Sequence, residues 1–503
     1  MAQENRRSFI KTVGVGMGAV ATSGLWLNKL FANTVQPVGE GVFGFTKEDI
    51  QKLLGIALSK GGEFSELYFE NKISSSVNMS EEIIKSSSES ISLGVGIRVI
   101  KGDQTGYAYT NELTFDKIKH AALTAAAIAS GPSKMSVANL NEIKPKVQTY
   151  DMVSPLTQAR LQDKIKLLKE GYDAAKNADP KITKISASIA DEIQRITIAN
   201  SEGLLVSDVR PQARLRVTAT AEKDSKLGTG SGNAGGRIGA DFYMNVETPT
   251  EIGKKAAKEA LALLEAENAP AGEFPVILSK DQSGVMIHEA VGHPLEADAN
   301  RKKQSIMWDK MGTMVSSPLL TIYDDATIPN YRGSLNIDDE GTQVEKTMLI
   351  EKGKLVGFLN DKLSAKILNH KENGHGRRQS YKSPPIPRMN NTVLAPGDTP
   401  PEEMIASVKK GFYAVTYQGG MVNNAGDFTF SVNLGYLIEN GKLTRPLRNA
   451  TLIGSNVQIL KRVDMVGNDM GFFLGTCGKA GQSVPVTAGT PSLRISKMTV
   501  GGV

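Results

Sequence analysis

The chain has 503 residues, 40% of them hydrophobic and 22% charged, a balance that is ordinary for a folded globular protein and a length that favours two domains. About half of the formal net charge of +6 comes from residues 1–32, and no long run of lysine and arginine follows, which argues against nucleic-acid binding. A single cysteine excludes an internal disulfide framework.

The first residues have the pattern of a targeting segment. Arg6 and Arg7 precede a modestly apolar, glycine-containing run from Thr12 to Leu27, which is typical of a twin-arginine export signal. The run is too short and too rich in glycine for a convincing membrane span. We therefore predict an export signal over residues 1–32 and a periplasmic location. The alternatives are a disordered tail or an uncleaved signal that anchors the protein to the membrane.

The next segment alternates between helical and extended patterns. Thr46, with Asp49 three residues later and an apolar stripe behind it, has the signature of a helix start. Lys101-Gly102-Asp103 separates two alternating runs and predicts a hairpin. The elements expected are helices beginning at 46 and spanning 114–130, 157–178 and 248–267, and extended segments at 64–79, 91–100, 105–110 and 182–222. Together they predict an N-terminal α+β domain over residues 45–267.

A linker and a change of character follow. The proline- and glycine-containing stretch 268–272 is the best linker candidate. Beyond it, short extended runs alternate with sharp turns, and Asn440-Gly441 is a strong two-residue hairpin signal. We expect an α+β protein of two domains. The C-terminal domain, residues 273–503, is dominated by antiparallel β-sheet and carries a metal-site helix at its start.

That helix contains two histidines with a glutamate directly after the first, His288, Glu289 and His293. In zinc peptidases, imidazoles hold the ion while such a carboxylate takes a proton from water. The usual spacing of the histidines is four residues, whereas here it is five, which places them about 140° apart on a straight helix. A widened i→i+5 turn, softened by Gly292 and Pro294, would bring them together. Otherwise they lie on different faces and hold no ion.

A third metal ligand has to come from outside this motif. Glu296 and Asp298 are the local candidates, and they could instead orient a ligand imidazole or form an ordinary surface pair. Cys477 is the distant candidate, because it lies between Gly475 and Gly478 and its thiolate is a strong zinc ligand. The alternative for a lone cysteine is a buried small apolar residue.

A basic loop between Gly374 and Met389 is a further candidate for binding. Its Arg377 or Arg378 could line the cleft and bind a peptide carboxylate. An equally good interpretation is a solvated connection whose arginines pair with surface acids.

At this point a family resemblance becomes specific. The chain resembles the TldD/PmbA family of metallopeptidases, and specifically the TldD type with its HExxxH motif and distant cysteine. The resemblance covers essentially everything after Thr46. It is carried by the segments 94–99, 106–111, 288–298, 376–389, 436–442 and 466–469 and by the Cys477 loop.

The resemblance implies both the ligands and the reaction. His288, His293 and Cys477 would bind Zn²⁺, and Glu289 would be the base that activates a zinc-bound water to hydrolyse peptide bonds in extended or unfolded peptides. It also implies a homodimer, or a heterodimer with a metal-free paralogue. The family is usually cytoplasmic, and the export signal departs from that pattern. The alternative function is a non-catalytic peptide-binding or regulatory subunit of such a dimer.

Overall fold

A computed structural model describes residues 43–502 apart from 130, 133, 152–154, 281, 424 and 425. It confirms the α+β class, with more residues in strands than in helices. The predicted export signal, residues 1–32, lies outside the described residues. None of the helices in the described ranges is both long and apolar enough to cross a membrane.

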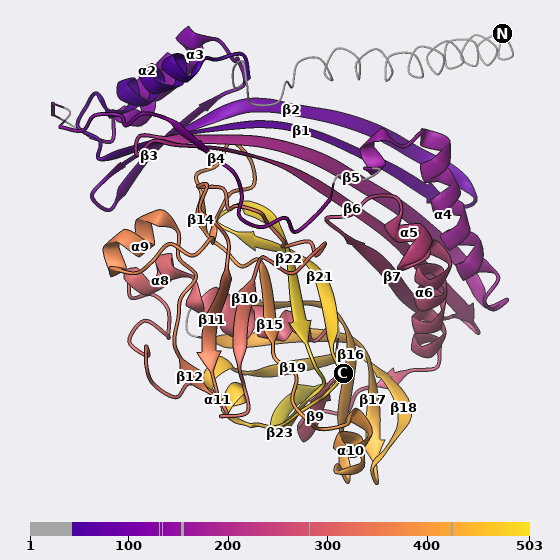
Figure 1. The fold of residues 1–503 in the computed structure, drawn as a ribbon. Helices are drawn as coiled ribbons and strands as arrows, with labels where there is room; N and C mark the ends of the chain where they lie inside the picture. The colour runs from indigo at the N-terminus through magenta and orange to yellow at the C-terminus, as the bar shows by residue number, and fades with distance from the viewer. Residues whose placement is uncertain are drawn as a thin grey trace, which may run out of the picture.

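The N-terminal half is built on one curved sheet of long strands (Figure 1). The strand order is β3-β2-β1-β5-β6-β7, all antiparallel neighbours, and the short β4 runs parallel to β6. The strands are β1 Phe64–Ser80, β2 Ile83–Lys101, β3 Gln104–Thr110, β4 Asn141–Ile143, β5 Ile182–Asn200, β6 Leu204–Lys223 and β7 Lys226–Gly236. The hairpin predicted at Lys101-Gly102-Asp103 is the β2–β3 turn, and β2 begins earlier than the sequence indicated.

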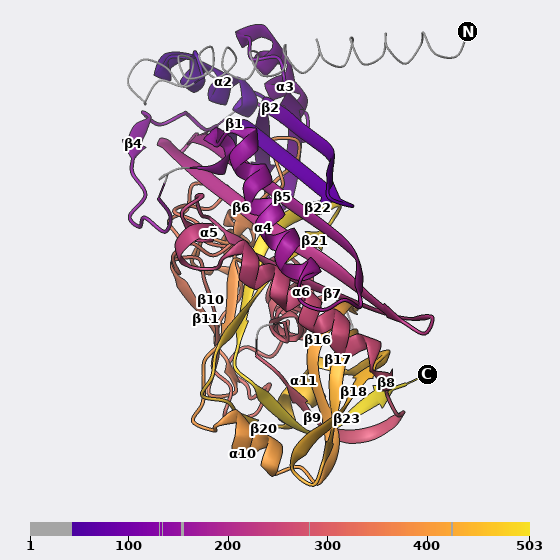
Figure 2. The ribbon, with the colours of Figure 1, turned by 90° about the vertical axis from the view of Figure 1, so that its right-hand side faces the viewer.

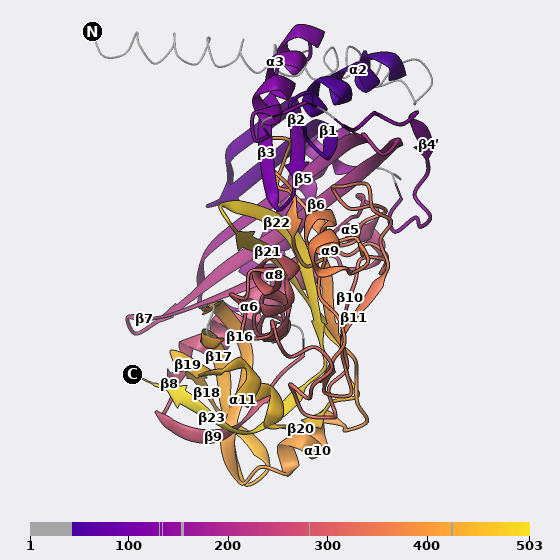
Figure 3. The ribbon, with the colours of Figure 1, turned by 90° about the vertical axis from the view of Figure 1, so that its left-hand side faces the viewer.

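Helices cover the convex face of this sheet. The helices are α2 Lys47–Leu58, α3 Phe115–Ala126, η1 Leu156–Gln158, α4 Leu161–Lys176, α5 Phe242–Asn245 and α6 Pro249–Leu264. α2 begins with the capping box that Thr46 and Asp49 predict. Strand residues alternate between faces, so Leu215 and its apolar neighbours pack under α4 and α6 (Figure 2), while α2 and α3 cover the other end (Figure 3).

The C-terminal half contains two larger sheets around one apolar core. One has the order β12-β11-β10-β15-β22-β21; the other runs β16-β9-β23-β19-β17-β18-β8, with β20 beside β23, and β13 pairs with β14. The strands are β8 Glu267–Asn268, β9 Gly272–Leu278, β10 Ile322–Asp325, β11 Lys346–Glu351, β12 Lys354–Leu355, β13 Gly376–Arg377, β14 Ile386–Pro387, β15 Asn391–Leu394, β16 Lys410–Val422, β17 Asp427–Glu439, β18 Lys442–Arg448, β19 Ala450–Ser455, β20 Val463–Val466, β21 Gly471–Lys479, β22 Gln482–Thr490 and β23 Leu493–Gly501. The helices are α7 Gly284–Ile287, α8 Ala297–Arg301, α9 Lys362–Leu368, α10 Pro401–Ala406 and α11 Asn456–Lys461.

The hairpin predicted at Asn440-Gly441 is confirmed as the β17–β18 turn. Both residues have positive φ, 51° and 77°, which is the backbone that a two-residue turn of this kind requires.

The two halves meet through buried ion pairs on the concave side of the N-terminal sheet. Arg98 on β2 binds Glu66 at 2.8 Å and Glu340 at 2.6 Å, and Arg210 on β6 binds Asp339 at 2.5 Å. All five side chains are almost fully buried. Separating the two halves would take Arg98 away from Glu340 and Arg210 away from Asp339, at a cost in buried charge pairing, so this interface fixes how the C-terminal half sits beneath the sheet.

The carboxyl of Glu70 at this interface makes folding depend on pH. Its Oε2 accepts the backbone N–H of Tyr381 at 2.6 Å, and burial raises its pKa from 4.5 to about 7. Below about pH 4.5 the group is protonated whether the chain is folded or unfolded. Between about pH 4.5 and 7 this carboxyl ionises in the unfolded chain but stays protonated in the folded protein, so the free energy of unfolding falls over this range.

Glu70→Gln removes that pH dependence. Between pH 4.5 and 8, the unfolding free energy of the variant minus that of the wild type is expected to rise by about 3 kcal/mol. Unfolding measured at a series of pH values tests this, with Glu273→Gln, an exposed change, as the control. A difference that stays constant over this range would contradict the prediction.

Candidate metal centre

The two motif histidines lie on a helix with one widened turn. α7 continues into a π-helical turn, His288–Gly292, followed by a 3₁₀ turn, His293–Leu295. The backbone N–H of His293 donates to the carbonyl of His288, five residues back, so of the two arrangements that the spacing left open the structure has the widened turn. This turn brings the imidazole rings to the same side of the chain, with centroids 5.1 Å apart.

Gly292 is needed in this turn because of packing. Its φ of −59° is helical and available to any residue, but a Cβ atom there would lie 1.8 Å from Sδ of buried Met389. The glycine therefore lets the metal-site helix approach the segment that carries Met389, a reason that the local sequence does not contain.

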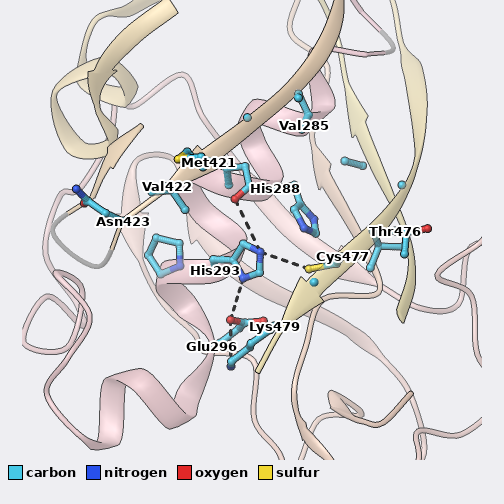
Figure 4. Close-up of a pocket in the computed structure, with 18 of the residues that line it drawn as sticks. Val285, His288, His293, Glu296, Met421, Val422, Asn423, Thr476, Cys477 and Lys479 are labelled. Carbon is cyan, nitrogen blue, oxygen red and sulfur yellow. Dashed lines mark hydrogen bonds and ion pairs between the residues drawn. The ribbon is translucent and has the colours of Figure 1, made fainter. Parts of the chain in front are cut away.

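Cys477 reaches the histidines from strand β21, at the edge of its sheet. Its Sγ lies 3.3 Å from Nε2 of His293, and one donor atom from each of His288, His293 and Cys477 lies within 4.8 Å of the others. Figure 4 shows the three side chains pointing toward one another. The structure thus brings together all three residues that the resemblance implies as ligands.

The donors of this cluster fit a zinc ion. Two imidazoles and a thiol are ligands that zinc prefers, and three protein ligands leave a position open. Nδ1 of His288 is buried and has no hydrogen-bond partner in the described part of the chain, a costly state for a polar atom. Burial raises the pKa of Cys477, but His288 and His293 override it and lower that pKa to about 4, toward the thiolate that metals bind. This is the one such cluster found among the described residues.

Glu289 lies beside the cluster. Its Oε2 is 3.8 Å from Nε2 of His293, and its side chain lines the same pocket. Burial is the largest influence on this carboxyl and raises its pKa, against the attraction of the two histidines. A carboxylate in this position can exchange a proton with a water molecule in the pocket.

The carboxylate of Glu296 orients His293 from behind. Its Oε2 lies 3.0 Å from Nδ1 of His293, leaving Nε2 to face Cys477. Lys479 holds both Glu296, at 3.1 Å, and Asp298, at 2.7 Å. The sequence left Glu296 and Asp298 open as metal ligands, as groups that orient an imidazole or as a surface pair. The structure fits the orienting role for Glu296, whereas Asp298 forms an ion pair with Lys479. Lys479 was not among the site residues predicted from the sequence. It lies two residues after Cys477 on β21, and this spacing places both side chains on the same face of the strand.

A pocket of about 620 Å³ opens over these residues. Gly419 to Asn423, from β16 and the turn after it, line one side, and Phe473 to Lys479 on β21 line another. From Gly419 to Val422, the edge of β16 away from β17 has no strand partner in the described part of the chain. Exposed Met421 and its neighbours lie across the opening from the histidines (Figure 4).

The loop arginines do not line this pocket. Arg377 and Arg378 are both buried, and Arg378 pairs with Glu66 of the N-terminal sheet. The interpretation of this loop as a solvated connection is therefore wrong. The two arginines line a second cavity instead.

Comparison with known proteins gives relatives along most of the chain. A metalloprotease TldD homolog of Haemophilus influenzae is 39% identical over 449 residues, covering 88% of this chain and 93% of the relative. A zinc metalloprotease TldD homolog of Saccharolobus solfataricus is 27% identical over 443 residues, covering 88% and 97%. A solved Thermotoga maritima structure, described as a DNA gyrase modulator, matches with a TM-score of 0.75 and 22% identity over 90% of this chain and 100% of that chain. This last similarity shows the fold alone.

The comparisons contradict the twin-arginine export signal predicted for residues 1–32. The relatives include metalloprotease TldD homologues, and the family that the chain resembles is usually cytoplasmic, which is not the pattern of an exported protein. The export signal is therefore corrected and not carried forward. The periplasmic location that depended on it stays an untested prediction.

Family models match three successive parts of the chain. PmbA/TldA metallopeptidase domain 1 matches residues 65–129, the central domain matches 154–264 and the C-terminal domain matches 271–502. The division of the sequence into two domains, 45–267 and 273–503, stays a prediction beside this threefold division. Together the three models match more than half of the sequence. The chain therefore belongs to the PmbA/TldD family of metallopeptidases.

Proposed function

We propose that the protein is a zinc-dependent peptidase that hydrolyses peptide bonds in extended or unfolded peptides. The observation that carries this proposal is the convergence of His288, His293 and Cys477 within 4.8 Å, with Glu289 beside them in an open pocket. Relatives with metalloprotease and zinc metalloprotease in their names support the same class of activity.

The ligands proposed for zinc are His288, His293 and Cys477. A bound zinc ion supplies a Lewis acid that polarises a peptide carbonyl and makes water a better nucleophile at neutral pH. Glu289 accepts the proton from the attacking water on Oε2 and returns it to the leaving amine nitrogen. Glu296 keeps Nδ1 of His293 engaged so that Nε2 stays directed into the cluster.

The free edge of β16 supports an extended substrate. Its unpaired backbone groups between Gly419 and Val422 line the pocket that contains Glu289. A peptide in strand conformation can hydrogen-bond to that edge through its main chain, which gives affinity with little side-chain selectivity. In a folded protein most backbone groups are already hydrogen-bonded within its own structure and are not free to pair with this edge. The dimer implied by the family resemblance is part of the same proposal.

The experiment is to compare one polypeptide in its folded and unfolded forms. Zinc-loaded protein is expected to cleave a reduced and alkylated disulfide protein at least about tenfold faster than its native form. Mass spectrometry of the products gives the rates, and the same protein after chelation is the blank. Equal cleavage of both forms would refute the extended-substrate proposal, and equal activity after complete zinc removal would refute zinc dependence.

A further inference from the structure

A second cavity, of about 500 Å³, lies between the concave face of the N-terminal sheet and the β21–β22 hairpin. Arg210, Gln212 and Arg214 line it from β6, where their i, i+2, i+4 spacing places them on one face. Ser483 to Pro485 line it from the other side. Figures 1 and 3 show β21 and β22 next to the long strands of the sheet.

The lining of this cavity has an excess of positive charge. Seven cationic side chains but three carboxylates line it. Each of these carboxylates already has a cationic partner. The pairs are Asp191 with Lys164 at 2.8 Å, Asp339 with Arg210 at 2.5 Å and Glu192 with Lys72 at 3.9 Å.

Four of the lining arginines make no ion pair with any described carboxylate. Arg214 binds the side-chain oxygen of Asn233, and the others donate to backbone carbonyls or a hydroxyl. The four are Arg214, Arg237, Arg332 and Arg377. Burial is the largest cause of the lowered pKa in every case, and it brings the pKa of Arg332 to about 10 and that of Arg377 to about 9. Arg237, Arg332 and Arg377 are buried and Arg214 is partly buried. Guanidinium groups withdrawn from water without a counter-charge are costly, so they mark a place where an anion would be stabilised.

Unpartnered polar atoms in the lining give independent support. Gln212 is only 7% exposed, yet neither its Oε1 nor its Nε2 has a hydrogen-bond partner among the described residues. Nε of Arg377 is also buried without an acceptor. A ligand with carboxylate oxygens would accept hydrogen bonds from both Nε2 of Gln212 and the free guanidinium N–H groups.

One strand separates this cavity from the metal pocket. Thr476 lines both, and it directly precedes Cys477 on β21. Arg332 reaches that strand from the cavity side, donating to the carbonyl of Gly475 at 3.1 Å and to Oγ1 of Thr476 at 3.3 Å. A strand is only about 5 Å wide, so a peptide held near Glu289 has to pass a short distance to place an acidic side chain among the arginines.

We propose that this arginine-lined cavity binds the carboxylates of peptide substrates and gives the enzyme a preference for acidic peptides. The proposal rests on the proposed peptidase function, and binding can be tested separately from turnover.

The test measures binding of fluorescent peptides by anisotropy to zinc-loaded Glu289→Gln protein, which removes the proposed base and so limits cleavage. Two peptides are compared, one with three glutamates and the other with glutamines in their place. The acidic peptide is expected to bind about tenfold more tightly, the effect of a charge-assisted hydrogen bond. Adding Arg214→Gln should abolish the difference. Arg216→Gln, an exposed arginine two residues along the same strand and outside the cavity, should leave it unchanged.

Gln212→Glu provides a second, nearly isosteric variant. The carboxylate of the new glutamate would supply the missing negative charge to the arginines. The variant should therefore have a higher melting temperature and no preference for the acidic peptide. Equal binding of the two peptides to the parent protein would overturn the proposal. The proposal would also be overturned if inorganic phosphate bound in an Arg214-dependent way while the acidic peptide bound no more tightly than the glutamine peptide. Failure of the peptidase proposal would give a different result: acidic peptides would still bind in an Arg214-dependent way, but the wild-type protein would show no zinc-dependent cleavage.

Discussion

Replacing Glu289 by glutamine is expected to reduce peptide hydrolysis by about 10²–10⁴-fold while zinc stays bound, because an amide cannot accept the proton of the attacking water. The substitution keeps the shape of the side chain, and Glu289 is not among the proposed ligands. Cleavage rates with a saturating unfolded substrate, together with zinc content per chain, measure both parts of the prediction.

The control for this variant is Glu273→Gln, which makes the same chemical change at an exposed residue paired with Lys497. It should keep wild-type activity. The result also separates the two functions considered from the sequence. A non-catalytic peptide-binding subunit would be indifferent to Glu289→Gln in every assay. Undiminished hydrolysis by the variant would rule out Glu289 as the base.

Cys477→Ser is expected to lower the zinc content of purified protein from about one ion per chain by about tenfold or more. A serine hydroxyl does not ionise near neutral pH, so the site loses its one anionic ligand and keeps two neutral imidazoles. Elemental analysis after dialysis against buffer with low free zinc measures the change.

Thr476→Ser is the matched control for the cysteine variant. It alters the preceding residue of β21 by one methyl group and keeps the hydroxyl that accepts from Arg332. It should retain zinc. If Cys477→Ser also retains a full equivalent, the thiolate is not a ligand, and Glu296 would have to be reconsidered as the third one.

Glu296 is not one of the proposed ligands, but its buried carboxylate positions one of them, His293. It holds Nδ1 of His293 and is itself held by Lys479, with Arg388 3.8 Å from its other oxygen. Burial raises its pKa, but these cations dominate and lower that pKa to about 2. Glu296 therefore stays ionised and fixes which nitrogen of His293 faces Cys477.

The sequence by itself determined the features whose causes lie within a few residues. The capping box at Thr46 fixed the start of α2, and Asn440-Gly441 fixed a hairpin, because caps and turns depend on local dihedral angles and hydrogen bonds. The five-residue spacing of His288 and His293 left two arrangements open, an i→i+5 turn or two separate faces, and the structure has the turn. The ligand set itself came from the family resemblance, and the local pattern left Glu296, Asp298 and Cys477 open.

Tertiary structure alone decided which distant residues meet. Cys477 reaches His293 across 184 positions because β21 is held by its pairing with β22 and by the core beneath both strands. The Gly292–Met389 contact and the unpaired arginines around Gln212 arise in the same way, where separately formed elements pack together. Local patterns specify the elements and their polar and apolar faces. Contacts between elements depend on sheet order, register and packing over the whole chain, which no single stretch of sequence contains.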